Sequence, residues 1–165
     1  MIKTILSIIA AALSAIYLGI ALPDYSAPTD KVIESDGLRV AQTGRRVTVY
    51  DEDGLIWELP DDVYAQDVLL GDIDHDEDDE ILILCWKRGR FGKKRPTWVK
   101  EDERSFSQHI FIYETDGGKV RPKWMASDIG MKAAAWELTD GVLSIKDTDG
   151  NLTRWVWLTW GLEKL

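Results

Sequence analysis

The sequence has few of the residues that redox and metal chemistry usually require. It contains one cysteine, Cys85, and two histidines, His75 and His109. One cysteine excludes both an intramolecular disulfide framework and a cysteine-based zinc site. Because Cys85 lies in the apolar run 81–86, we expect a buried, unreactive thiol. We expect His75 to face solvent and His109 to have a hydrogen-bonded structural role.

Familiar catalytic motifs are also missing from the sequence. There is no glycine-rich phosphate-binding loop, no GxSxG nucleophile elbow and no HExxH zinc motif. The formal net charge of −9 disfavours nucleic acid and anionic membrane surfaces as direct partners. We therefore predict a protein that is not an enzyme. A hydrolase that uses the acidic residues near position 75 is the remaining catalytic alternative, although nothing there indicates two carboxyl groups in different environments.

The N-terminal segment is the longest stretch without charge. Residues 4–22 form 19 consecutive uncharged positions after Lys3, close to the roughly 20 that span a bilayer. Residues 1–23 are predicted to form a hydrophobic helix that is a signal anchor, or a signal peptide if the chain is cleaved at Gly19-Ile20-Ala21. Both alternatives export the chain, either to the membrane with an extracytoplasmic domain or into the medium. Residues 24–36 are predicted to be a linker.

The rest of the sequence shows alternating apolar residues and turn signals, which predict β-hairpins. Segments 47–57, 110–124 and 143–155 share an apolar strand, an Asp-Gly turn and a return strand that ends in tryptophan. Three loose copies of one hairpin indicate a repeat architecture, with the three tryptophans in its core. The length allows about nine to eleven strands. Segment 131–141 is left open as a strand or a short helix.

Seven carboxylates crowd the segment 71–80, GDIDHDEDDE, which precedes an apolar strand. We call residues 71–80 the acidic loop. It resembles the calcium loop of FG-GAP/VCBS-type β-propeller repeats, except that Glu77 stands where glycine is expected. The resemblance implies one calcium ion, and alternate residues of a curled loop can point oxygens at such an ion. The candidate ligands are Asp72, Asp74, Asp76, the carbonyl of Asp78, and Glu80. The alternative is a solvated acidic turn without metal.

The same resemblance implies an all-β fold of antiparallel hairpin repeats over residues 37–165. A closed propeller takes about four to eight blades, so we expect a partial propeller, or a compact sandwich or barrel. Segment 87–113 is similar to small exported bacterial proteins of this repeat class, some labelled nuclear receptor-binding factor 2-like. We do not take that label as a function, because an exported chain has no evident nuclear receptor to bind.

A basic insertion at 88–107 is the main candidate surface for a partner. Aromatic residues interleave with its positive charges, which favours a folded, docked loop over a floppy one. The alternative is a solvated loop whose charges pair with the acidic rest of the protein. The candidate residues are Arg88, Arg90, Phe91, Lys93, Lys94, Arg95 and Trp98. We predict a non-catalytic extracytoplasmic interaction module that binds a protein. The alternative is a cell-wall or glycan-binding protein that uses tryptophans and this loop.

Overall fold

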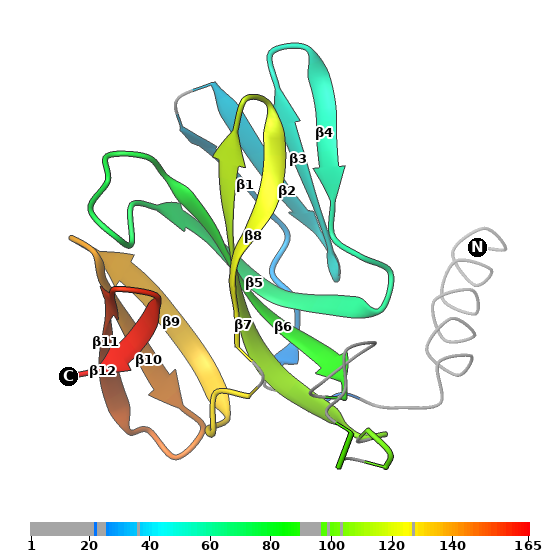
Figure 1. The fold of residues 1–165 in the computed structure, drawn as a ribbon, viewed down its shortest axis with the longest axis vertical. Helices are drawn as coiled ribbons and strands as arrows, with labels where there is room; N and C mark the ends of the chain where they lie inside the picture. The colour runs from blue at the N-terminus through cyan, green and yellow to red at the C-terminus, as the bar shows by residue number, and fades with distance from the viewer. Residues whose placement is uncertain are drawn as a thin grey trace, which may run out of the picture.

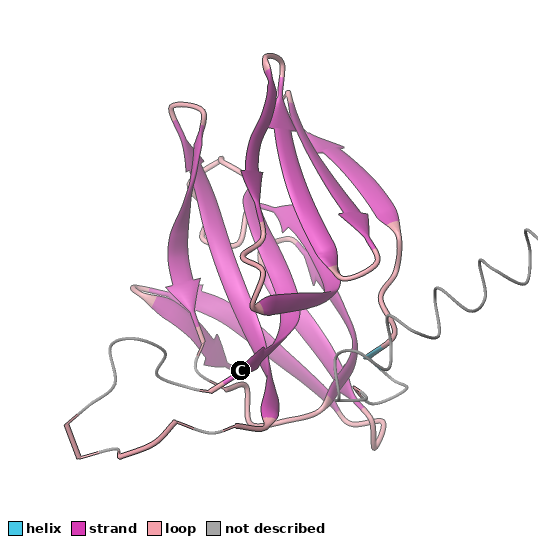
Figure 2. Ribbon diagram, turned by 90° about the vertical axis from the view of Figure 1, so that its right-hand side faces the viewer, coloured by secondary structure: helices cyan, strands magenta, loops and turns pink. Residues whose placement is uncertain are grey.

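The computed structural model describes residues 22, 26–35, 37–89, 97–98, 100–102, 104–126 and 128–165. Over these residues the chain forms twelve strands in three four-stranded antiparallel sheets, which confirms the all-β prediction (Figures 1 and 2). The predicted hydrophobic helix over 1–23 falls almost wholly outside them. In the described part, no helix is long and apolar enough to span a membrane.

Each sheet is a meander whose strands are neighbours in chain order. The N-terminal sheet contains β1 (Lys31–Ser35), β2 (Leu38–Thr43), β3 (Arg46–Asp51) and β4 (Gly54–Glu58). The central sheet contains β5 (Val63–Gly71), β6 (Glu80–Arg88), β7 (Phe106–Asp116) and β8 (Lys119–Met125). The C-terminal sheet contains β9 (Ala133–Thr139), β10 (Val142–Asp147), β11 (Leu152–Leu158) and β12 (Gly161–Lys164).

The central sheet is covered on both faces. Alternate residues of β6 point in opposite directions, so Ile81 and Ile83 join a core with the N-terminal sheet, while Leu82 and Leu84 join a core with the C-terminal sheet. This double burial explains why β6 is apolar at every position from Ile81 to Trp86 rather than at alternate ones. Cys85 is fully buried in the first core, and burial raises the pKa of its thiol, as expected for an unreactive cysteine.

Aspartates close two of the hairpin turns. Asp51 Oδ1 accepts hydrogen bonds from the backbone N–H groups of Asp53 and Gly54. Asp147 Oδ1 likewise accepts from the N–H groups of Asp149 and Asn151. These are side-chain-stabilised turns, as their shortness in the sequence indicates.

Buried glutamines connect the three sheets. Gln42 of β2 donates to the carbonyl of Gln66 in β5 at 3.0 Å, and Gln66 Oε1 accepts from Trp86 and from Gln108 of β7. Gln108 in turn bonds both backbone groups of Ala133 in β9, at 2.7 and 2.9 Å. Because these amides are removed from water, their mutual hydrogen bonds fix how the sheets meet.

The tryptophans that end the repeated hairpins have the predicted core role. Trp57 packs on Tyr113, with ring centroids 4.6 Å apart, while Trp124 and Trp155 pack against the core between the central and C-terminal sheets. Trp157 packs on that same core, whereas Trp160 is 78% exposed. Exposure to solvent thus distinguishes Trp160 from the other tryptophans named here.

Two features differ from the expectations. β1 lies inside the 24–36 segment that the sequence assigns to a linker. The count of twelve strands over the described residues exceeds the predicted nine to eleven, because several hairpin turns hold only two residues. Segment 131–141, for which the sequence left a strand and a short helix open, contains strand β9. Arg88 at the start of the basic insertion belongs to β6, and Phe106 and Ser107 at its end belong to β7.

Candidate metal centre

The acidic loop joins β5 to β6, two strands that pair directly from Gly71 and Glu80 onward. Four of its carboxylates converge: each of Asp72, Asp74, Asp76 and Glu80 offers an oxygen within 4.8 Å of the others. We call these four residues the acidic cluster. Four of the five predicted ligands therefore lie together. The side chain of Asp78 is exposed and is not among them, and ligation by its carbonyl stays a prediction.

Asp72 organises the backbone of the loop. Its Oδ1 accepts hydrogen bonds from the N–H groups of His75 and Asp76, at 2.6 and 3.2 Å, and its Oδ2 accepts from Glu77 at 3.1 Å. Slight burial would raise the pKa of Asp72, but these amide donors outweigh it and hold that pKa below its usual value. The loop thus curls around a carboxylate that stays ionised.

The curl requires left-handed backbone at two positions that are not glycine. His75 has φ of 65° and Glu77 has φ of 73°. For residues with a side chain this conformation costs about 1–2 kcal/mol each. Glu77 stands at the position where the calcium-loop resemblance expects glycine. The chain therefore takes the sharp turn of such a loop without the residue that usually permits it.

Glu80 is the buried member of the acidic cluster. Its side chain is only 2% exposed, and its Oε2 accepts a hydrogen bond from the N–H of Ile73 at 3.1 Å. Burial raises the pKa of Glu80, opposed by its bonds to Lys123 and Ile73. The Ile73 bond ties the start of the loop to its end.

Lys123 enters the acidic cluster from β8, and the sequence reading missed it. Its Nζ lies 2.5 Å from Asp74 Oδ2, 2.7 Å from Glu80 Oε1 and 3.6 Å from Asp76 Oδ2. The register of β7 with β8 shifts at this point, where Ile112 pairs with Trp124 but Tyr113 pairs with Pro122. Lys123 is therefore the extra residue of a β-bulge, a device that redirects a side chain.

Asp74 has one oxygen that the described residues leave without a partner. Its Oδ2 meets Lys123, but its Oδ1 is buried and accepts no hydrogen bond from any part of the chain that the structure describes. A buried, unpaired carboxylate oxygen is costly. Four carboxylates converge here, and the one ammonium of Lys123 contacts three of them, those of Asp74, Asp76 and Glu80.

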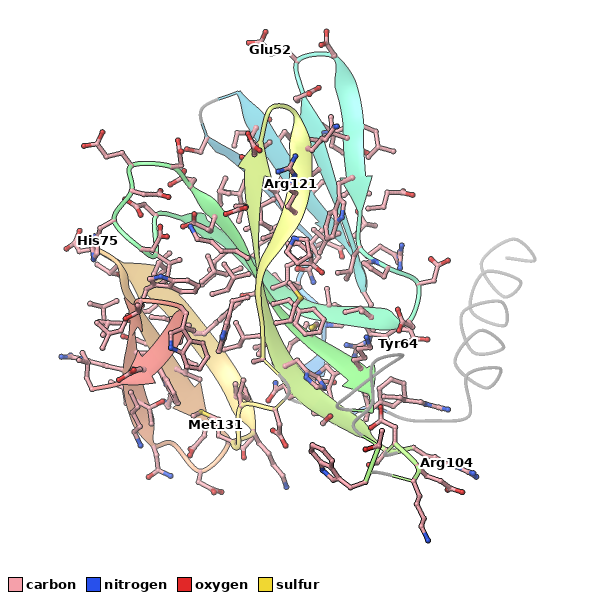
Figure 3. The ribbon with its side chains drawn as sticks, viewed as in Figure 1. Glu52, Tyr64, His75, Arg104, Arg121 and Met131 are labelled. Carbon is pink, nitrogen blue, oxygen red and sulfur yellow. The ribbon has the colours of Figure 1, made fainter. Side chains whose placement is uncertain are left out.

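The tip of the acidic loop rests on the C-terminal sheet. His75 is exposed, as predicted, but its imidazole lies where a side chain at Gly141, in the β9–β10 turn, would collide with it. Gly71, at the base, approaches Leu138 of β9 in the same way. Figure 3 shows His75 beside the end of β9. The loop is thus held between two sheets.

The spacing of the acidic cluster can be compared with the size of a bound ion. Oxygens on opposite sides of an ion lie about 4.6–5.2 Å apart for Ca²⁺ and about 4.0–4.2 Å apart for Mg²⁺. The candidate oxygens lie within 4.8 Å of one another, and all are carboxylate oxygens, which hard cations prefer. The four residues could hold a metal ion, and the buried Oδ1 of Asp74 is an available ligand.

His109 has the structural role that the sequence predicts. It is 2% exposed, and its Nδ1 lies 2.8 Å from the carbonyl of Ala126, so that Nδ1 carries the proton. Its Nε2 then accepts from the Ser107 hydroxyl at 2.9 Å. Burial lowers the pKa of His109, partly opposed by the Ala126 carbonyl. Both ring nitrogens are thus occupied.

Only two residues of the predicted partner surface can be placed. The guanidinium of Arg88 lies over the ring of Phe106, 4.9 Å from its centroid, and Trp98 is 82% exposed. The remaining candidates lie outside the described residues: Arg90, Phe91, Lys93, Lys94 and Arg95. The role of the basic insertion as a partner surface therefore stays a prediction.

A pocket lies between β8 and the C-terminal sheet. This pocket, of about 340 Å³, includes the indoles of Trp124, Trp155 and Trp160 and the acidic side chain of Asp128. We call it the tryptophan pocket. Ile110 of the central sheet also lines this pocket. The sequence does not predict that these tryptophans line one pocket, because this depends on how β8 and β11 pack together.

Comparison with known proteins adds no relative: no family model, no curated protein and no solved structure matches this chain significantly. What the chain does must therefore be argued from its own residues.

Proposed function

We propose that this chain is a non-catalytic extracytoplasmic binding module of FG-GAP/VCBS-like repeat type, stiffened by one calcium ion in its acidic loop. The observation that carries the proposal is the buried Oδ1 of Asp74, which no described residue satisfies, within a cluster of four carboxylates. A divalent cation would satisfy that oxygen and reduce the repulsion among its neighbours. The candidate oxygens lie within 4.8 Å of one another, a spread that calcium coordination spans, and calcium is the ion that the loop resemblance implies.

The architecture supports a binding role. Three successive four-stranded meanders resemble three blades of a propeller, and fewer than four blades do not close a ring. The first and last sheets of such an array each keep an outer face and edge strands available to a partner. Trp98 and Trp160 add large exposed indoles, a residue type enriched in interfaces. A protein partner is the first expectation.

Calcium titration of the full-length chain by isothermal calorimetry tests the metal part. We expect one site per chain in the wild type and loss of that site in Asp74→Asn. Asp149→Asn is the matched control, because it makes the same change in the exposed β10–β11 turn. No heat of binding in the wild type, or an undiminished site in Asp74→Asn, would contradict calcium binding at the acidic cluster.

The tryptophan pocket favours a second candidate function, recognition of a cell-wall glycan. Indole rings stack on sugar rings, and a carboxylate such as that of Asp128 accepts hydrogen bonds from sugar hydroxyls. Purified peptidoglycan should then retain the wild type and Trp98→Ala but release Trp160→Ala. Equal retention of all three, or none, would argue against glycan recognition by this pocket.

A further inference from the structure

The ammonium of Lys123 lies where the acidic cluster would place a metal ion. It meets two carboxylates at 2.5 and 2.7 Å and a third at 3.6 Å, with its side chain 13% exposed. Burial alone would lower the pKa of Lys123, but its hydrogen bonds to Asp74 and Glu80 raise that pKa above its ordinary value. The ammonium is therefore a permanent positive charge at neutral pH.

The β-bulge makes this placement specific to Lys123. Trp124, the next residue, packs against the core with the C-terminal sheet, and the Lys123 ammonium lies 5.7 Å from the centre of the Trp157 ring on that sheet. Consecutive strand residues normally face opposite sides, whereas these two face the same side. The Lys123 side chain thus reaches across β7 to the acidic loop, which joins β5 and β6, two strands that do not pair with β8.

We propose that Lys123 is an internal cation that competes with a metal ion for the acidic cluster. The inference rests on the proposed calcium site. Glu80 and Asp74, whose Oε1 and Oδ2 the ammonium now contacts, are two of the four carboxylates that could hold the ion. A divalent ion bound by these carboxylates repels the ammonium at close range. Metal binding therefore displaces Lys123 from the loop, toward the face of Trp157, where the positive charge keeps an aromatic partner.

This competition has two consequences for the loop. Without metal, Lys123 offsets part of the repulsion among four carboxylates, so the loop keeps its shape. With metal, the ion must first displace a tethered cation, so its affinity is lower than the carboxylates alone would give. Calcium occupancy is thereby coupled to the position of a β8 side chain and to its contact with the C-terminal sheet.

The test compares Lys123→Met with Lys119→Met in the full-length chain. Both variants remove one positive charge from β8, but Lys119 is exposed near the hairpin turn and has no contact with the acidic cluster among the described residues. Calcium titration by calorimetry should show at least about tenfold tighter binding to Lys123→Met than to the wild type. Lys119→Met should match the wild type. Lys123→Gln serves as the second variant if Lys123→Met fails to fold.

A metal-free measurement separates this inference from the proposed function. In chelator, Lys123→Met should unfold at lower denaturant concentration than Lys119→Met, and saturating calcium should close that gap. Equal calcium affinity of the wild type and Lys123→Met would overturn the competition and leave the calcium site standing. No calcium binding by any of the proteins would overturn the calcium site, and the competition with it.

Discussion

Glu80 and Lys123 form a nearly buried ion pair that joins the acidic loop to β8. Their charged atoms lie 2.7 Å apart, and their side chains are 2% and 13% exposed. The pair spans residues on strands that are not neighbours in the sheet. Removing one partner of such a pair leaves the other charge poorly compensated, which is more costly than the pair itself is stabilising.

Glu80→Gln should therefore destabilise the metal-free protein by about 2–4 kcal/mol, because it leaves the Lys123 ammonium with fewer partners and alters the bond to Ile73. Denaturant unfolding in chelator measures the loss. Glu58→Gln, an exposed change on β4, should shift stability by less than about 0.5 kcal/mol. A loss for Glu80→Gln no larger than for Glu58→Gln would show that the ion pair is not a structural tie.

Glu77→Gly should stabilise the protein by about 0.5–1 kcal/mol, because glycine relieves the left-handed backbone at the cost of some chain entropy. The φ of Glu77 is 73°, whereas the neighbouring Asp78 is not in the left-handed region. Asp78→Gly therefore serves as the control and should destabilise slightly. Denaturation midpoints for the two variants that move in the same direction would contradict the described conformation of the loop.

Gln108→Ala should destabilise the fold by about 2–4 kcal/mol, because it removes hydrogen bonds to Ala133 and Gln66 and takes away the acceptor of the buried Ala133 N–H. The bonds concerned are 2.7–2.9 Å long. Chemical denaturation is the measurement, with Glu137→Ala on the exposed side of β9 as the control. Equivalent midpoints for the two variants would mean that the glutamine network does not hold the sheets together.

His109 should make stability fall as the solution is acidified. Burial lowers the pKa of His109 from 6.5, so the unfolded chain takes up a proton at higher pH than the folded chain does. Its contribution is complete above pH 6.5 and is lost as pH falls toward the lowered value. The loss between about pH 7.5 and pH 5.5 should shrink in His109→Gln and persist in the exposed variant His75→Gln. An unchanged loss in His109→Gln would assign the pH dependence to other groups.

The sequence predicted the local β structure well because its signals are local. Apolar alternation, Asp-Gly turns and the apolar run 81–86 of β6 each depend on the immediate environment of a few residues. The same holds for Asp72, Asp74, Asp76 and Glu80, whose spacing within one loop was enough to group them. Glu77 adopts the left-handed backbone that glycine would usually provide at this position.

Features that depend on contacts distant in the chain were not predictable in this way. Lys123 reaches the acidic cluster, 43 positions from Glu80, only because a bulge in β8 redirects it. The tryptophan pocket requires β8 and β11 to meet. The glutamines that join the three sheets look like ordinary polar strand residues in the sequence. Each of these depends on register and sheet stacking, which no short pattern encodes.

The most direct test of the account is the melting temperature of the full-length chain in calcium and in chelator. Calcium at about 100 times its dissociation constant should raise the melting temperature by about 5–10 °C. Magnesium should raise it less, and Asp74→Asn should show no rise with either ion. Identical melting temperatures in calcium and in chelator would contradict calcium binding and leave the acidic loop a metal-free turn held by its own hydrogen bonds and by Lys123.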